Sequence, residues 1–217
     1  MKRRAQAHSQ SPPRDDWTTP VEVLDLVREV YPAGVFLDPA TNQASKVGAL
    51  HNFHRGRVDS DFETRELGQY RRWYSADGLE VNWRRFAIDT GSPEVDQLVF
   101  VNPPYGRRVN AMWADKVASE AAAGVHIMAL VPASTDTIWF QRYWGADKVC
   151  FWRGRLRFGG GNDTKEPADF GSAVAYFGPR GDRFGEVFGR RGRVVPGLSS
   201  SAPLLLDAHL SGGVSGA

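Results

Sequence analysis

A short apolar run that two adjacent prolines bring to an end is the strongest constraint on how this chain folds. Residues 98–101 read Leu-Val-Phe-Val, which is typical of a strand buried on both faces, and Asn102, Pro103, Pro104 and Tyr105 follow directly. Proline has no N–H to donate and a fixed φ, so strand pairing cannot continue past this point. We therefore expect a rigid turn that presents an amide and an aromatic ring at the end of a buried strand, where open α/β sheets bind their ligands.

Apolar runs of strand length alternate with helical patterns along the rest of the chain. The runs predict strands at 34–37, 125–131 and 148–152, and a terminal antiparallel portion at 156–158, 173–177 and 184–188. The helical patterns lie at 19–30, 111–123 and 135–144. This alternation predicts an α/β fold with a mostly parallel central sheet and helices on both faces.

The first helix carries its own start signal. Thr19, Pro20, Val21 and Glu22 form a capping-box pattern with proline at the first helical position. Thr19 is therefore expected to cap that helix.

Composition divides the chain into one folded domain and two tails. With 217 residues and 41% hydrophobic content, the chain is long enough for a single domain with a core. Residues 1–14 are polar and basic and are expected to form a flexible arm, 15–193 the domain, and 194–217, rich in Ser, Gly and Ala, a largely disordered tail. Within the domain, residues 43–76 are charged and show no core pattern, so they are expected to form a long excursion, which is either a solvated loop of mixed charge or a DNA contact.

The bulk properties exclude several classes of protein. A net charge of +2 permits a nucleic-acid partner without requiring one. The single Cys150 excludes an intramolecular disulfide and a cysteine-based metal site, and His51 and His54 have no companion ligands in a known spacing, so no metal is expected. No stretch is apolar enough for a membrane span or a signal peptide, which predicts a cytoplasmic protein with no membrane partner.

The predicted turn suits chemistry on an amino group attached to a flat ring. The Asn102 side-chain carbonyl and the Pro103 backbone carbonyl can each accept one hydrogen of adenine N6, which aims the nitrogen lone pair at a methyl donor. Tyr105 can stack on a base pulled out of its helix. No strong general base is needed, because the nitrogen becomes acidic only after it gains the methyl group. The alternative is a plain strand-to-helix turn, for which Asn-Pro and Pro-Pro are common.

Six sequence blocks in a fixed order extend this interpretation to residues 15–180. They are Asp16-Trp17-Thr18-Thr19-Pro20, Leu37-Asp38-Pro39-Ala40-Thr41, Asp77-Gly78-Leu79 with Trp83, Val99 to Gly106, Val131 to Thr137 with Trp139-Phe140, and Gly154 to Phe158. In these blocks the chain resembles the phage-type DNA N-6-adenine methyltransferases, relatives of the Dam enzymes. The resemblance implies a Rossmann-like methyltransferase fold, S-adenosylmethionine as methyl donor, double-stranded DNA as partner, and a phage or restriction–modification setting.

The resemblance also assigns roles to residues. Asn102, Pro103, Pro104 and Tyr105 would be catalytic, and the donor would be held by Trp17, Thr19, Pro20, Asp38, Pro39, Ala40, Asp77 and Gly78. Alternatives stay open for two of these positions: Asp38 before Pro39 also fits a turn cap, and Asp77-Gly78 also fits an ordinary turn. The residues after Asp38 lack the glycines usual at this point in methyltransferases.

A third group of residues is expected to contact the substrate. Arg153, Arg155 and Arg157 alternate with apolar residues, so at strand spacing they share a face that can contact phosphates. Phe158 and Ser134, together with Tyr105, would border the target base. The alternatives are a solvated strand face paired with Asp163 or Glu166, and helix capping by Ser134.

Taken together, these features predict an adenine-specific DNA methyltransferase that acts by base flipping. A methyltransferase for RNA adenine or a protein glutamine, and a DNA-binding relative that has lost catalysis, are the alternatives. Neither the recognition site nor the oligomeric state follows from the sequence.

Overall fold

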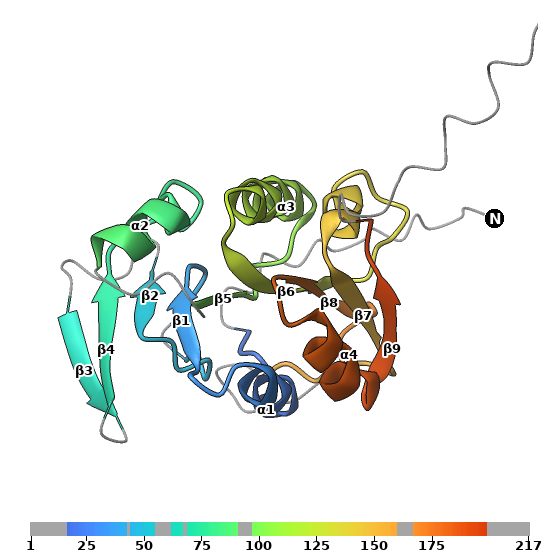
Figure 1. Cartoon of the computed structure of the whole chain (residues 1–217), viewed down its shortest axis with the longest axis horizontal. Helices are drawn as coiled ribbons and strands as arrows, with labels where there is room; N and C mark the ends of the chain where they lie inside the picture. The colour runs from blue at the N-terminus through green and yellow to red at the C-terminus, as the bar shows by residue number, and fades with distance from the viewer. Residues whose placement is uncertain are drawn as a thin grey trace, which may run out of the picture.

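The computed structural model describes residues 17–42, 44–54, 62–66, 69–90, 97–159 and 167–198. These residues form one nine-stranded sheet with helices on both faces (Figure 1). The predicted arm 1–14, Asp16, Asp163, Glu166 and residues 199–217 of the predicted tail lie outside the described residues.

The strands follow the order β3-β4-β2-β1-β5-β6-β8-β7-β9 across the sheet. Their bounds are β1 Val35–Asp38, β2 His51–Phe53, β3 Phe62–Glu66, β4 Gln69–Tyr74, β5 Leu98–Val101, β6 His126–Pro132, β7 Lys148–Trp152, β8 Ser172–Phe177 and β9 Gly192–Pro196. Strands β4, β2, β1, β5 and β6 pair in parallel, whereas the β3–β4, β6–β8, β7–β8 and β7–β9 pairs are antiparallel. The sheet is therefore mixed, and the mostly parallel arrangement predicted from the sequence is not confirmed.

Four α-helices and a 3₁₀-helix are present in the described part of the chain. They are α1 Val21–Val30, α2 Trp83–Asp89, α3 Arg107–Ala122, η1 Phe140–Gly145 and α4 Gly181–Gly189. Helices α1 and α4 cover one face of the sheet and α2 and α3 the other (Figure 1). No helix of the described ranges is long and apolar enough to cross a membrane.

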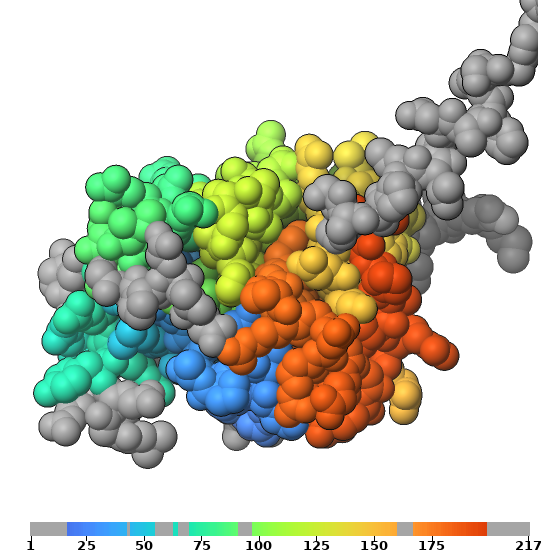
Figure 2. All heavy atoms as spheres, viewed as in Figure 1, coloured from blue at the N-terminus to red at the C-terminus, as the bar shows by residue number. Residues whose placement is uncertain are grey.

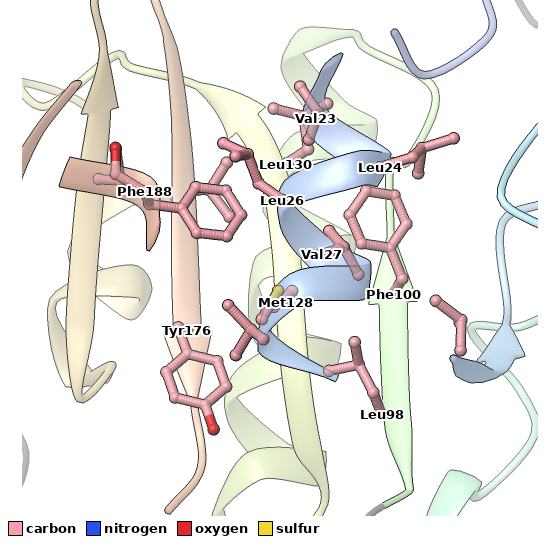
Figure 3. Packing of buried hydrophobic residues seen from close by; sticks show 14 of the residues in the cluster. Val23, Leu24, Leu26, Val27, Leu98, Phe100, Met128, Leu130, Tyr176 and Phe188 are labelled. Carbon is pink, nitrogen blue, oxygen red and sulfur yellow. The ribbon is translucent and has the colours of Figure 1, made fainter. Parts of the chain in front are cut away.

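The face under α1 and α4 carries one of the two apolar clusters of the described residues. Figure 3 shows residues of α1 packed against β5 and β6, namely Val23, Leu24 and Val27 near Leu98, Phe100, Met128 and Leu130. Helices α1 and α4 also meet at the surface, in blue and orange in Figure 2. There Arg190 pairs with Glu29 at 2.6 Å, and the Arg180 guanidinium donates to the Val30 carbonyl at 2.7 Å.

On the opposite face, α2 is fastened to α3 by a buried carboxylate. Glu120 of α3 accepts the backbone N–H groups of Trp83 and Arg84 at 3.0 and 3.2 Å, and Lys116 Nζ donates to it at 2.6 Å. The first turn of α2 has no acidic residue of its own, so Glu120 supplies the negative charge that a helix N-terminus favours. The position of α2 therefore depends on one side chain of α3.

The strands predicted at 34–37, 98–101, 125–131, 148–152 and 173–177 are confirmed within one or two residues at their ends. The predicted excursion at 43–76 is wrong, because β2, β3 and β4 belong to the main sheet. Strand β2 is wholly buried although it carries His51 and Asn52. Partners satisfy its polar groups: Asn52 Nδ2 donates to the Ala49 and Arg72 carbonyls, and His51 Nδ1 lies 3.0 Å from the Tyr74 hydroxyl.

Three helix predictions need correction. Helix α1 begins after Pro20 with no side-chain cap, so Thr19 does not cap it. Helix α3 starts at Arg107 rather than near 111, directly after Gly106. The segment 135–144 forms a turn followed by η1, because the Thr137 hydroxyl donates to the Ser134 carbonyl at 2.7 Å and tightens the chain there.

Two predictions near the C-terminus also differ from the structure. Residues 184–188 were expected to form a strand but lie in α4, where Phe184, Val187 and Phe188 bury one helical face. Residues 194–196 were expected to belong to the disordered tail but complete β9, which pairs with β7. The folded part therefore continues past residue 193.

Replacing Glu120 with alanine is expected to destabilise the protein by about 3 kcal/mol, because Lys116 and two N–H groups would lose a buried partner. Urea unfolding measures the change. Asp89→Ala is the matched control, since it removes an exposed ion pair of the same i,i+4 spacing with Arg85 and should cost less than about 0.5 kcal/mol. Equal losses for both variants would contradict the anchoring role of Glu120.

Candidate active site

One cavity of about 300 Å³ lies at the carboxyl ends of the parallel strands. Its walls are the segments that follow β1, β2, β4 and β5, together with one face of α3 and Trp17. From β1 the chain moves to β2 and β4 on one side, whereas β5 and β6 lie on the other side. The cavity thus sits where the strand order reverses, the usual place for a ligand in an open α/β sheet.

Asn102 stands at the end of β5 with both ends of its amide held. Its Nδ2 donates to Thr19 Oγ1 at 3.0 Å, and its Oδ1 accepts from the Tyr105 hydroxyl at 2.6 Å. Pro103 is buried and follows directly in the turn. The amide therefore has one defined orientation, with its oxygen on the side of Tyr105.

Tyr105 belongs to a cluster of four rings beside the cavity. Trp17, Phe158 and Phe170 each meet it edge-to-face, with ring centroids 6.0, 5.8 and 5.2 Å away. Trp17 and Phe158 stack on each other at 5.0 Å. Burial raises the pKa of the Tyr105 hydroxyl well above its usual value, so this hydroxyl stays protonated and acts as a hydrogen-bond donor.

The segment before α1 forms a strap across this cluster. Thr18 N–H donates to the Gly159 carbonyl at 2.9 Å, and Asn42 Nδ2 donates to the Trp17 carbonyl at 3.0 Å. A Cβ on Gly159 would come within 2.5 Å of Thr18 Oγ1, so glycine permits this close approach. The strap fixes Trp17 and Thr19 relative to the turn after β5.

Asp38 ends β1 and is only 3% exposed. Its Oδ1 accepts the Ala40 N–H at 3.1 Å and its Oδ2 the Ser45 hydroxyl at 3.2 Å. Burial raises the pKa of this carboxyl to about 6. The turn-capping alternative for Asp38 is thus observed, and contact of Asp38 with a methyl donor stays a prediction.

Asp77 and Gly78 bring the segment after β4 against the segment after β1. Asp77 Oδ1 accepts the Leu79 N–H at 3.0 Å, and Trp83 Nε1 of α2 donates to the Gly78 carbonyl at 2.8 Å. A Cβ at Gly78 would lie 2.0 Å from the Pro39 carbonyl oxygen, which is closer than atoms can approach. Glycine at this position therefore allows the two loops to form one wall of the cavity.

The structure brings most of the predicted site residues together. Those that line the cavity are Trp17, Pro39, Ala40, Asp77, Gly78, Asn102, Pro103, Pro104 and Tyr105. Thr19 and Phe158 lie one contact behind the wall, through Asn102 and Trp17 respectively. Asp38 and Pro20 shape the turn after β1 and the start of α1.

The remaining predicted residues lie outside the cavity wall. Arg155 and Arg157 are exposed, and the Arg155 guanidinium lies beside Gly171, next to the carboxyl end of β6. The Ser134 carbonyl accepts from Thr137, so this residue shapes a turn and its side chain does not cap a helix.

Several cavity residues were missed from the sequence. They are Thr41, Asn42, Phe53, His54, Leu79, Val109, Met112 and Trp113. Phe53 is the last residue of β2 and His54 follows it, in the segment that the sequence predicts to be an excursion. The three α3 residues have the i, i+3, i+4 spacing of one helical face, a signal that could have found them.

These features define an α/β domain with a ligand cavity at the carboxyl ends of its parallel strands. Residues 72–177, which run from within β4 to the end of β8, match the model of the family described as DNA N-6-adenine-methyltransferase (Dam). This match supports the assignment of the chain to a Dam-like family, and the resemblance predicted from the sequence is confirmed over these residues. The general activity of such a family is methylation of adenine N6 in DNA. No curated protein matches the chain.

The stability of the protein is expected to depend on pH through Asp38. Below its unfolded pKa of 3.8 the carboxyl is neutral in both states and its burial carries no charge penalty. As pH rises from 3.8 through the folded pKa of about 6, the carboxyl ionises more readily in the unfolded protein than in the folded one. The free energy of unfolding therefore falls by on the order of 3 kcal/mol. Asp38→Asn should flatten the decline of unfolding free energy between these pH values. An unchanged slope in urea titrations of this variant would contradict the assignment.

Alanine at Gly78 is expected to cost about 1–3 kcal/mol, because the new methyl group would displace the backbone of Pro39. Gly145→Ala is the matched control, since a Cβ there meets no atom within 4 Å, and its effect should stay within about 0.5 kcal/mol. Thermal unfolding of the two variants compares them. A Gly78→Ala protein as stable as the control would show that the two loops are not packed as described.

Proposed function

We propose that this protein transfers a methyl group from S-adenosylmethionine to N6 of an adenine that has been flipped out of double-stranded DNA. The Asn102 amide supports this proposal, because it lies in the cavity wall with both of its ends held and the Pro103 carbonyl follows it. Two fixed acceptors next to each other suit an amino group with two hydrogens. The family match over residues 72–177 supports adenine in DNA as the substrate.

The fold supports a Rossmann-like methyltransferase arrangement. The five parallel strands lie in the order β4-β2-β1-β5-β6, which by their sequence in the chain is third, second, first, fourth and fifth. This is the order of the doubly wound nucleotide-binding sheet. The antiparallel strands β8, β7 and β9 extend that sheet on one side.

The residues of the cavity fit the proposed donor. Phe53, Met112 and Trp113 offer apolar surface for a flat adenine ring, and Asp77 and Asn42 offer polar groups for its amino group and ribose hydroxyls. A cavity of about 300 Å³ is also large enough to enclose most of a small molecule. When bound, S-adenosylmethionine supplies an electrophilic methyl group on a sulfonium.

The protein's own residues would act by orientation. Asn102 Oδ1 and the Pro103 carbonyl accept the two N6 hydrogens, which turns the nitrogen lone pair towards the methyl group. The Tyr105 hydroxyl is protonated and does not serve as a base. The rings of Tyr105 and Trp17, which line the cavity, offer a surface on which the flipped base packs, and Phe158 supports Trp17 from behind.

Exposed arginines would hold the DNA backbone near this end of the sheet. Arg155 lies beside the carboxyl end of β6, and Arg107 and Arg108 begin α3 immediately after the turn. All three are exposed. Together with Arg157 they would contact DNA phosphates. The protein would act in the cytoplasm, in a phage or restriction–modification setting.

Purified protein incubated with methyl-labelled donor and duplex DNA tests the proposal. We expect label in DNA, recovered as N6-methyladenosine after digestion to nucleosides, and a rate at least about 100-fold lower for Asn102→Ala. Asn82→Ala is the control, because Asn82 caps α2 away from the cavity and should affect stability but not the rate.

The same assay separates the alternatives. Label in RNA or in a protein glutamine, with none in DNA, would replace the proposed substrate. Absence of donor binding by calorimetry at millimolar concentration would favour a DNA-binding relative without catalysis. Methylation of DNA that persists in Asn102→Ala would refute the role of that amide.

A further inference from the structure

The hydroxyl of Thr19 is used in a way that its local sequence does not predict. Thr19 stands in a capping-box pattern, yet α1 begins without any side-chain cap. Instead, Thr19 Oγ1 accepts from Asn102 Nδ2 across 83 positions of the chain. The Thr19 hydroxyl therefore stabilises the turn after β5 and leaves the start of α1 without a side-chain cap. A bond of that kind normally stabilises a helix by about 1 kcal/mol.

Holding the nitrogen of an amide decides where its oxygen points. If the Asn102 amide rotated by half a turn, Nδ2 would take the place of Oδ1, and a donor would replace the acceptor that an amino group needs. In the structure the Thr19 hydroxyl accepts from Nδ2, and this bond must break before the amide can rotate. Its own position is defined, because Thr19 is only 3% exposed and its neighbours Trp17 and Thr18 are bonded to Asn42 and Gly159.

The second contact of the amide competes with the substrate. The Tyr105 hydroxyl donates to Asn102 Oδ1 at 2.6 Å, which is the atom that would receive an N6 hydrogen. When an amino group arrives, this bond must be shared or broken. Thr19 is then the side chain, among the described contacts of Asn102, that keeps the amide in its orientation.

We propose that Thr19 is a positioning residue for methyl transfer, acting by fixing the Asn102 amide with its oxygen towards the substrate amino group. This inference rests on the proposed function. It also replaces the donor-binding role expected from the sequence, because Thr19 lies behind the cavity wall and reaches the site through Asn102.

Three variants test the proposal in the full-length protein. Thr19→Val keeps the shape of the side chain but removes the acceptor, and its kcat is expected to fall about tenfold. The affinity for S-adenosylmethionine, measured by calorimetry, should stay within about twofold of the wild type. Thr19→Ser restores the hydroxyl and should recover most of the rate. Thr90→Val is the matched control, since it removes a threonine hydroxyl that donates to the Phe86 and Ala87 carbonyls of α2 and is not in the cavity wall, and it should leave kcat unchanged.

A double-mutant cycle shows whether Thr19 acts through Asn102. If it does, Thr19→Val adds no further loss of kcat in an Asn102→Ala background. Additive losses would overturn the proposal. A weaker donor affinity in Thr19→Val with kcat unchanged would also overturn it and would restore a direct donor contact.

A measurement without substrate separates this inference from the proposed function. The side-chain NH₂ signal of Asn102, identified by its loss in Asn102→Ala, should exchange slowly with solvent in the wild type and in Thr19→Ser. It should exchange faster in Thr19→Val. Equal exchange rates in all three proteins would show that Thr19 does not hold the amide, even if the protein methylates DNA. A wild type that methylates no DNA would instead overturn the proposed function, and the exchange measurement would remain valid.

Discussion

The cavity depends on the parallel pairing of β1 with β5 in the middle of the sheet. From these two strands the chain spreads to opposite sides, so their carboxyl ends open onto the cavity. The turn after β1 brings Asp38 and Pro39 to one side of that space, and the turn after β5 brings Asn102 to the other. The chemistry that we propose therefore centres on these two turns, whereas the segments after β2 and β4 and one face of α3 line the rest of the cavity.

Each turn is held by contacts that come from a distant part of the chain. Glu120 of α3 accepts the Trp83 N–H in the first turn of α2. The Trp83 indole N–H donates to the Gly78 carbonyl, and Gly78 packs against Pro39. On the other side, the strap before α1 holds Asn102 through Thr19. Buried polar contacts of this kind are costly when one partner is missing, so they define a single arrangement of the walls. The rigidity of the amide is thus a property of the whole domain.

How much could be predicted from the sequence differs between these parts. Strand β5 and its turn were predictable, because prolines stop pairing through local geometry alone. Strand β2 was not predictable, because it buries the polar residues His51 and Asn52. Their hydrogen-bond partners, Tyr74 and the carbonyls of Ala49 and Arg72, cannot be recognised from a local sequence pattern. Thr19 shows the same limit at the site. Its local sequence is typical of a helix cap, but its hydroxyl accepts a hydrogen bond from Asn102, which is distant in the sequence.

A crystal structure with S-adenosylhomocysteine, the demethylated form of the proposed donor, would show whether the cavity holds the donor. We expect electron density between the Pro39 and Asp77–Gly78 wall and the turn at Asn102, with the sulfur facing the Asn102 and Pro103 oxygens. Density at the opposite, amino ends of the strands, such as the smaller cavity beside Phe36 and Trp83, would contradict it. So would a structure grown at saturating ligand in which the predicted cavity contains only water.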